Sequence, residues 1–136
     1  MPQRNLTPQA SVAAAFVARE PSPCLPVVLI PAYKPERVLS AIVAELVRSE
    51  RVQAVVVVDD GSESDFVQIF SALACVPRVH LLTHIVNLGK GAALKTGLNF
   101  IRSTFRASVG AVTADADGQH TVNDILIAAD VLSVHL

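Results

Sequence analysis

The sequence predicts an α/β fold in which a mostly parallel sheet carries helices on both faces. Two observations predict it. Runs of consecutive apolar, β-branched residues alternate four times with segments whose apolar residues recur at helical spacing. The strand-like runs show no polar alternation, as is typical of strands covered on both sides. Alternating strands and helices form sheets of this kind, and their ligands bind beyond the carboxyl ends of the strands.

The first half of the chain contains two strand–helix units. Val27–Ile30 is a continuous apolar strand that Pro31 ends, and Pro35 suits the first turn of the following helix. That helix has an apolar stripe of Val38, Leu39, Ile42, Val43, Leu46 and Val47. The second unit has a strand at Ala54–Val58 and a loop at Asp59–Ser62. Its helical stripe, which Pro77 closes, consists of Phe66, Ile69, Phe70 and Leu73.

The third unit begins with a shorter strand at Val79–Leu82 and continues through the loop Asn87–Gly91. Its helix is expected to carry three apolar residues on one side, Leu94, Leu98 and Ile101. Gly97 within this helix costs about 1 kcal/mol relative to alanine. We therefore expect Gly97 to permit a close packing contact.

The fourth unit has a strand over Val109–Ala114 and a helix that follows a polar turn. Thr121, with Asp124 three residues later, resembles a capping box at the start of this helix. The apolar residues of the helix are Ile125, Ala129 and Leu132. Every polar loop between a strand and its helix is then predicted to lie at the same edge of the sheet.

Length and composition predict one soluble domain. The chain has 136 residues, of which 51% are apolar, enough for a sizeable core. Eleven basic residues balance twelve acidic ones, which argues against nucleic acid as a partner, and no apolar run approaches a bilayer span. Cys24 and Cys75 form neither a CxxC pair nor a disulfide framework. They fit a reducing compartment, and we expect a cytoplasmic protein.

Residues 1–25 are expected to be a poorly ordered leader or a short helix. Val12–Ala18 follows Arg4 and superficially resembles the apolar part of a signal peptide, but no cleavage-like site precedes Arg19 and Glu20. Three prolines mark the start of the domain: Pro21, Pro23 and Pro26. The domain is therefore predicted to span residues 26–136.

Two carboxylates, Asp115 and Asp117, follow the fourth strand directly. Magnesium and manganese prefer oxygen ligands and keep positions open for substrate phosphates, so this pair suits either ion. An ordinary turn is the alternative, because Asp side chains also bond nearby backbone amides. A calcium loop of the EF-hand type needs a Glu at its twelfth position, where this chain has Leu126.

The segment Gly89–Thr96 resembles two phosphate-binding loops and matches neither. A P-loop needs glycine immediately before its Lys-Thr pair, and a dinucleotide-binding loop needs glycine or alanine at its last position. Leu94 occupies both places. Lys90 could assist an anion or lie in solvent as an ordinary lysine.

Two further observations narrow the chemistry. Asp59 and Asp60 end a strand, where a carboxylate can accept hydrogen bonds from a ligand. Of the four histidines only His120 is next to the acidic pair in the sequence, too few for a zinc site, and Ser62 has no evident histidine partner for a nucleophilic triad.

Four segments, taken in order, resemble family 2 glycosyltransferases of the GT-A fold. They are Ile30–Tyr33, Val57–Ser62, Asn87–Leu94 and Asp115–His120. The resemblance covers about residues 26–136 and is greatest to the branch that includes dolichyl-phosphate mannosyltransferase and bacterial polyprenyl-phosphate glycosyltransferases. It implies a Rossmann-like half that binds a nucleotide sugar.

The resemblance also implies roles for individual residues. The base and ribose of a UDP- or GDP-linked sugar would lie against Pro31, Tyr33, Val58 and Asp60. The DxD element would be Asp115, Ala116 and Asp117, with Mg²⁺ or Mn²⁺ bound by Asp115, Asp117 and Gln119. Lys90 would assist at the diphosphate.

The sequence departs from the family pattern in two ways. Lys34 and Pro35 stand where relatives often have Asn-Glu, and the acidic residue comes one position later, at Glu36. In addition, the chain stops within the helix after the DxD element, whereas members continue for roughly another hundred residues. The resemblance places the acceptor half and the catalytic base there, so we nominate no catalytic residue and expect the chain alone to be inactive.

The leading hypothesis is the donor-binding part of a glycosyltransferase whose acceptor is a polyprenyl phosphate lipid. That acceptor would place the protein at the cytoplasmic face of a membrane. One alternative is a non-catalytic module that self-associates through an exposed sheet edge. The other is a P-loop or dinucleotide-binding enzyme with a degenerate loop.

Overall fold

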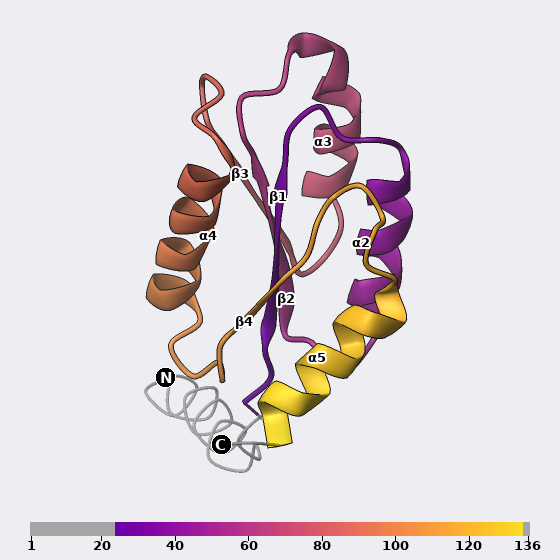
Figure 1. Cartoon of the computed structure of the whole chain (residues 1–136), viewed down its shortest axis with the longest axis vertical. Helices are drawn as coiled ribbons and strands as arrows, with labels where there is room; N and C mark the ends of the chain where they lie inside the picture. The colour runs from indigo at the N-terminus through magenta and orange to yellow at the C-terminus, as the bar shows by residue number, and fades with distance from the viewer. Residues whose placement is uncertain (1–23, 135–136) are drawn as a thin grey trace, which may run out of the picture.

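The computed structural model describes residues 24–134, which form the predicted α/β fold. Four parallel strands lie in the order β3-β2-β1-β4 (Figure 1). The strands are β1 (Val27–Ala32), β2 (Ala54–Asp59), β3 (Val79–Thr83) and β4 (Ala111–Thr113). The helices are α2 (Val38–Arg48), α3 (Val67–Ala74), α4 (Lys90–Thr104) and α5 (Val122–Val134), with a 3₁₀ turn, η1, at Ser64–Phe66.

The sheet has its most apolar strands at its centre. β1 pairs with β2 on one side, Val27 opposite Ala54, and with β4 on the other, Val27 opposite Ala111. All six residues of β2 are buried, as are five of the six in β1. The continuous apolar runs therefore correspond to strands that are covered on both faces, as the sequence predicted.

The helices divide unequally between the two faces of the sheet. The side chains of Val28 and Ile30 pack with α2, α3 and α5, whereas those of Val27 and Leu29 pack with α4. Figure 1 shows α4 alone on one side of the sheet and α2 and α3 on the other. This alternation follows from the two-residue repeat of a strand.

Three local features differ from the sequence-based expectation. Helix α3 is preceded by the 3₁₀ turn η1, which the sequence did not predict. The fourth strand is shorter than Val109–Ala114, because Gly110 has a φ of 142° before the strand begins at Ala111. Leu98 does not lie on the buried side of α4 and is 45% exposed. The buried side consists of Ala93, Gly97 and Ile101.

Gly97 explains the orientation of α4. A Cβ atom at this position would lie 2.2 Å from Cδ1 of Leu29, so only glycine lets the helix approach β1 this closely. This confirms the predicted close contact. The cap of α5 is also confirmed, since the Asp124 N–H donates to Thr121 Oγ1 at 3.1 Å. Arg51, in the turn before β2, forms an ion pair with Asp130 that ties α5 to the rest of the domain.

The prediction of a leader concerns residues 1–25, nearly all of which lie outside the described residues. Within residues 24–134 no helix has the length and apolar character that crossing a membrane would require.

Candidate functional site

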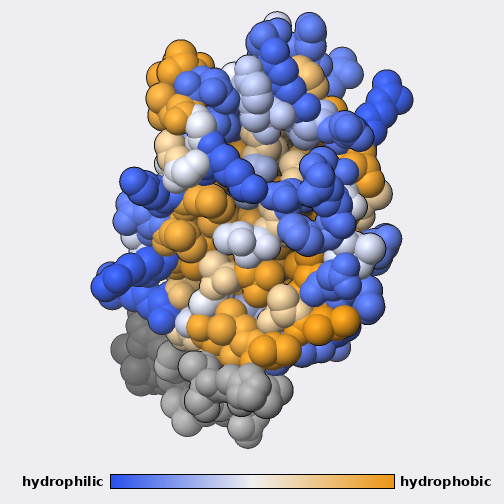
Figure 2. Space-filling view, in the orientation of Figure 1, coloured by the Kyte–Doolittle hydropathy of each residue, from blue (hydrophilic) through white to orange (hydrophobic). Residues whose placement is uncertain are grey.

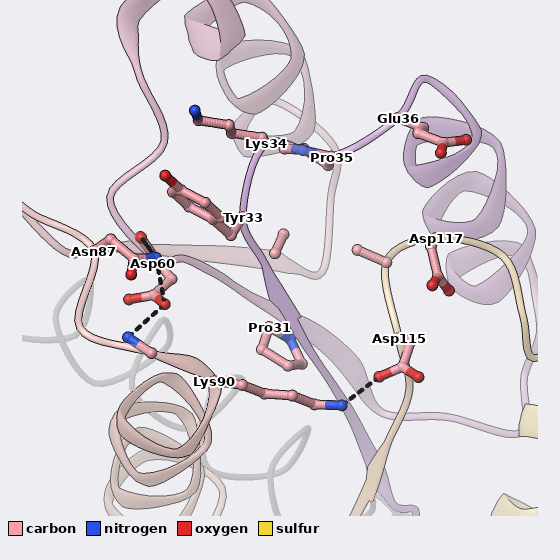
Figure 3. A pocket seen from close by; sticks show the side chains of 13 residues that line it. Pro31, Tyr33, Lys34, Pro35, Glu36, Asp60, Asn87, Lys90, Asp115 and Asp117 are labelled. Carbon is pink, nitrogen blue, oxygen red and sulfur yellow. Dashed lines mark hydrogen bonds and ion pairs between the residues drawn. The ribbon is translucent and has the colours of Figure 1, made fainter.

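A cavity of about 530 Å³ lies beyond the carboxyl ends of the strands (Figure 3). Segments that follow β1, β2, β3 and β4 all contribute to its walls, which confirms that the polar loops gather at one edge of the sheet. The lining residues are Pro31, Ala32, Tyr33, Lys34, Pro35, Glu36, Asp60, Asn87, Gly89, Lys90, Asp115, Ala116 and Asp117.

The segment after β1 forms one wall. Lys34 has a positive φ of 47°, and its backbone N–H donates to Ser62 Oγ at 2.9 Å, which ties the segment to the loop after β2. The Lys34 ammonium lies 3.0 Å from Glu63 Oε1, and this hydrogen bond and charge raise the pKa of Lys34. Tyr33 is 48% exposed, so its ring presents an aromatic face to the cavity edge and to solvent.

Asp60 is buried at the end of β2, and protein donors surround its carboxylate. Oδ1 accepts from His84 Nδ1 at 2.8 Å and from the Leu88 N–H at 2.9 Å. Oδ2 accepts from Asn87 Nδ2 at 3.1 Å and from the Gly89 N–H at 2.9 Å. Since a carboxylate has about four acceptor positions, these donors use its capacity. Asp60 thus organises the loop between β3 and α4.

The surroundings of Asp60 favour its ionised form. Burial by itself would raise the pKa of Asp60. The hydrogen bond from His84 and those from the amides of Leu88 and Gly89 outweigh burial, and the pKa of Asp60 is lowered. The carboxylate is therefore a fixed negative charge in the floor of the cavity.

The loop between β3 and α4 also rests on Gly61. A Cβ atom there would lie 2.2 Å from the Asn87 nitrogen and from the Val86 carbonyl carbon, and Gly61 has a φ of 76°. Glycine is therefore required by both space and backbone conformation. Together, Gly61 and Asp60 hold the loop against the end of β2.

Lys90 and Asp115 face each other across the cavity (Figure 3). Lys90 Nζ lies 2.8 Å from Asp115 Oδ1, with the Lys90 side chain 63% exposed and that of Asp115 29% exposed. The hydrogen bond from Lys90 lowers the pKa of Asp115, and the same bond raises the pKa of Lys90. His120 is farther away, with its Nδ1 at 4.0 Å from Asp115 Oδ2. Because this pair is solvent-accessible, it can open for a ligand at small cost.

The turn after β4 has features of both alternatives for Asp115 and Asp117, an ordinary turn and a site for a divalent cation. Asp117 Oδ1 accepts the Gln119 N–H at 3.0 Å, the local bond of an ordinary Asp turn. The carboxylates of Asp115 and Asp117 nevertheless line the cavity, and oxygen donors of this kind fit magnesium or manganese. Among residues 24–134 no group of three or more His, Cys, Asp or Glu side chains could hold a metal ion. A ligand would have to supply further oxygens.

The structure brings together seven of the nine residues that the sequence singled out: Pro31, Tyr33, Asp60, Lys90, Asp115, Ala116 and Asp117. Val58 differs from the expectation, because its fully buried side chain points toward α4 and does not line the cavity. Gln119 is exposed and is also not among the lining residues.

Sequence reasoning missed several residues of this region. Lys34, Pro35 and Asn87 line the cavity, and His84 is largely buried beside it. Asn87 and His84 flank the exposed apolar residues Ile85 and Val86, a pattern opposite to that of an ordinary surface loop. This inversion is visible only in the structure, because the sequence does not show which of these side chains are exposed.

The model of the family described as glycosyl transferase family 2 matches residues 27–133. The chain belongs to this family. The match covers all four strands and nearly all of α5, so the resemblance inferred from the four segments is confirmed, and the α/β fold agrees with the GT-A architecture.

Two relatives match about seven tenths of this chain. One, from Methanococcus voltae, is named UDP-N-acetylglucosamine–dolichyl-phosphate N-acetylglucosaminyltransferase and is 31% identical over 111 residues, 71% of this chain and 43% of its own length. An uncharacterized protein of Methanocaldococcus jannaschii is 34% identical over 98 residues, 72% of this chain and 37% of its own. The chain thus matches less than half the length of these relatives.

Proposed function

We propose that residues 26–136 are the donor-binding part of a glycosyltransferase that takes a UDP- or GDP-linked sugar and transfers the sugar to a polyprenyl phosphate. The observation that carries the proposal is the cavity beyond the strands, which has an aromatic side chain at one wall and paired carboxylates at the other. A nucleoside diphosphate needs both kinds of surface, because its base is flat and apolar and its phosphates are anionic.

In this proposal the base and ribose occupy the side of the cavity formed by Pro31 and Tyr33. The exposed ring of Tyr33 offers a face for stacking, and its hydroxyl offers a hydrogen-bonding group. Asp60 acts from the floor by holding the adjacent loop, since its carboxylate oxygens already accept four hydrogen bonds. Glu36 is a further acidic residue among those that line the cavity.

The diphosphate would occupy the opposite side, where Asp115 and Asp117 would hold Mg²⁺ or Mn²⁺ and the exposed amide of Gln119 is close in sequence. Such an ion, when bound, neutralises negative charge on the departing nucleoside diphosphate. The Lys90 ammonium, 2.8 Å from Asp115 in the free protein, would leave that carboxylate and contact a phosphate oxygen.

The acceptor proposal rests on the relative from Methanococcus voltae, whose name includes dolichyl phosphate. A lipid acceptor would bring the cavity close to the cytoplasmic face of a membrane. Three exposed apolar residues beside the cavity are compatible with that location: Ile85, Val86 and Leu88, with exposures of 98%, 58% and 59%.

The test is calorimetric titration of the purified chain with UDP- and GDP-sugars, with and without Mn²⁺. We expect binding that requires the ion and is lost in Asp115→Asn and Asp117→Asn. Asp65→Asn is the matched control, because Asp65 is an exposed aspartate that does not line the cavity. Circular dichroism would establish that each variant is folded.

Metal-independent binding of the sugar nucleotides, or equal binding by the Asp115 and Asp65 variants, would contradict the proposal. Tight metal-free binding of ATP or NAD would instead favour the degenerate phosphate-loop alternative.

A further inference from the structure

We propose that His84 is a positioning residue that holds the loop between β3 and α4 at a fixed position relative to the end of β2. The position of this loop determines where Lys90, the first residue of α4, enters the cavity. His84 would act through Asp60. The proposal deepens the proposed function, since it concerns how the same cavity is held in shape, but the geometry on which it depends is that of the protein without ligand.

His84, the first residue after β3, connects the end of β2 to α4. Its Nδ1 lies 2.8 Å from Asp60 Oδ1 at the end of β2, and its Nε2 lies 2.9 Å from Thr96 Oγ1 within α4. The side chain of His84 is only 10% exposed and that of Asp60 only 4%. A largely buried imidazole with a partner at each nitrogen has a fixed orientation, unlike an ordinary surface histidine.

The other hydrogen bonds of Asp60 fix the backbone just before the start of α4. The same oxygen that binds His84 accepts the Leu88 N–H, and the other oxygen accepts the Gly89 N–H. Gly89 has a φ of 99° and immediately precedes Lys90, the first residue of the helix. The backbone is therefore fixed at Leu88 and Gly89, the two residues immediately before Lys90. Lys90 then reaches Asp115 at 2.8 Å.

The loop has little else to hold it. Ile85, Val86 and Leu88 point into solvent, and Figure 2 shows apolar residues exposed at the upper left, where Figure 1 places this loop. Side chains that remain exposed contribute little packing energy. The conformation of the loop therefore depends on the polar contacts beneath it and on the close approach at Gly61.

The two nitrogens of His84 have separable roles. With Nδ1 as the donor to Asp60, Nε2 faces the Thr96 hydroxyl, which can either donate or accept a hydrogen bond. An asparagine amide nitrogen stands in for Nδ1, whereas a glutamine amide nitrogen stands in for Nε2. His84→Asn should keep the bond to Asp60, and His84→Gln should lose it and keep the reach to Thr96.

The decisive measurement is amide hydrogen exchange of Leu88 and Gly89 by NMR, in the full chain without ligand. We expect His84→Gln to speed exchange of both amides at least about tenfold, because charge-assisted hydrogen bonds are the strong ones, and His84→Asn to leave them near wild type. The amides of Val56 and Val57 in β2 serve as an internal reference for global stability. His80→Gln is the matched control, since His80 lies on β3, the strand before the loop, against Phe100 and Phe105.

The second readout is titration with GDP or UDP in the presence of Mn²⁺. The affinity for the nucleotide should follow the exchange data. His84→Gln should bind more weakly than wild type, and His84→Asn should bind nearly as tightly as wild type. The proposal is overturned if the two variants behave alike in exchange, or if exchange rises equally at Leu88, Gly89, Val56 and Val57. If the exchange pattern appears as expected but no variant binds nucleotide, the proposed function has failed and the positioning role of His84 has not.

Discussion

Asp60 and Asp115 both line the cavity, but their carboxylates have different surroundings. Asp60 is 3% exposed and bonded to His84, Asn87, Leu88 and Gly89, so it cannot change partners without disrupting the loop. Asp115 is bonded to the flexible, exposed side chain of Lys90. At the scale of residues, one negative charge supports structure and the other is available for exchange with a ligand.

Replacing Lys90 with methionine should change two affinities in opposite directions. Asp115 would no longer have a competing cation, so Mn²⁺ without nucleotide should bind up to about fivefold more tightly, the range of an exposed ion pair. The diphosphate should bind more weakly, because a phosphate contact is lost. Calorimetry with Mn²⁺ alone and then with Mn²⁺ and UDP or GDP separates the effects. Lys95→Met, an exposed lysine of the same helix, should change neither.

Asp60→Asn should destabilise the protein at neutral pH and much less in acid. The amide presents its nitrogen to two of the four donors, which lose an acceptor at about 1.5 kcal/mol or more each, so we expect a loss of at least about 3 kcal/mol at pH 7. The lowered pKa of Asp60 stabilises the wild type above the unfolded value of about 3.9, and this contribution is lost as the pH falls through the folded pKa. Urea unfolding at pH 7 and pH 3 should show the difference shrinking.

A difference between Asp60→Asn and wild type that stayed constant down to pH 3 would mean that the ionised form of Asp60 contributes nothing to stability.

At the scale of elements, the local sequence correctly predicted the strands that are buried along their whole length. It did not predict features that depend on packing between elements. Val27–Ile30 and Ala54–Val58 were identified because strands covered on both sides must be apolar throughout. The buried side of α4 was predicted wrongly at Leu98, although the close contact at Gly97 was predicted correctly, because the apolar stripe alone does not show which side of the helix faces the sheet. The turn at Ser64–Phe66 follows from how the chain enters α3, which no local pattern encodes.

Two glycines of α4 should respond oppositely to alanine. Gly97→Ala places a methyl group 2.2 Å from Leu29, whose side chain is fully buried, so overpacking should cost about 1–3 kcal/mol and outweigh the helical preference for alanine. Gly91→Ala, with nothing within 4 Å of the added Cβ, should gain up to about 1 kcal/mol. Thermal or urea unfolding measures both, and equal effects would contradict the close contact.

At the scale of the whole molecule, the order of strands and helices was enough to predict where the site lies. It was not enough to predict the contacts within the site. Parallel strands bring Tyr33, Asp60 and Asp115 to one edge, which a sequence pattern can predict. The four donors around Asp60 come from a loop more than twenty residues away along the chain, and no spacing rule links His84 or Asn87 to that carboxylate. The family resemblance implied that Val58 lines the cavity, whereas its side chain packs with residues of α4.

The sheet has an open edge at β4, since no other strand of residues 24–134 pairs with it beyond β1. The Ala114 N–H donates to Leu29, so by alternation the Thr113 N–H points away from β1. We expect the isolated chain to self-associate through this edge and Thr113→Pro to reduce association without unpairing β1. Sedimentation equilibrium over a range of concentrations would test it. Thr113→Val, which keeps the N–H, is the control and should associate like wild type.

Since all four strands run in one direction, the rim opposite the cavity is structurally remote from ligand contacts. Cys75, an exposed thiol just after α3, lies where the chain returns toward the start of β3 at that far rim. With Cys24 changed to serine it becomes a single handle for a maleimide dye or a biosensor tether. Immobilised there, the molecule would present its open end to the flowing solution, so that metal and nucleotide could be titrated on one surface without blocking their entrance.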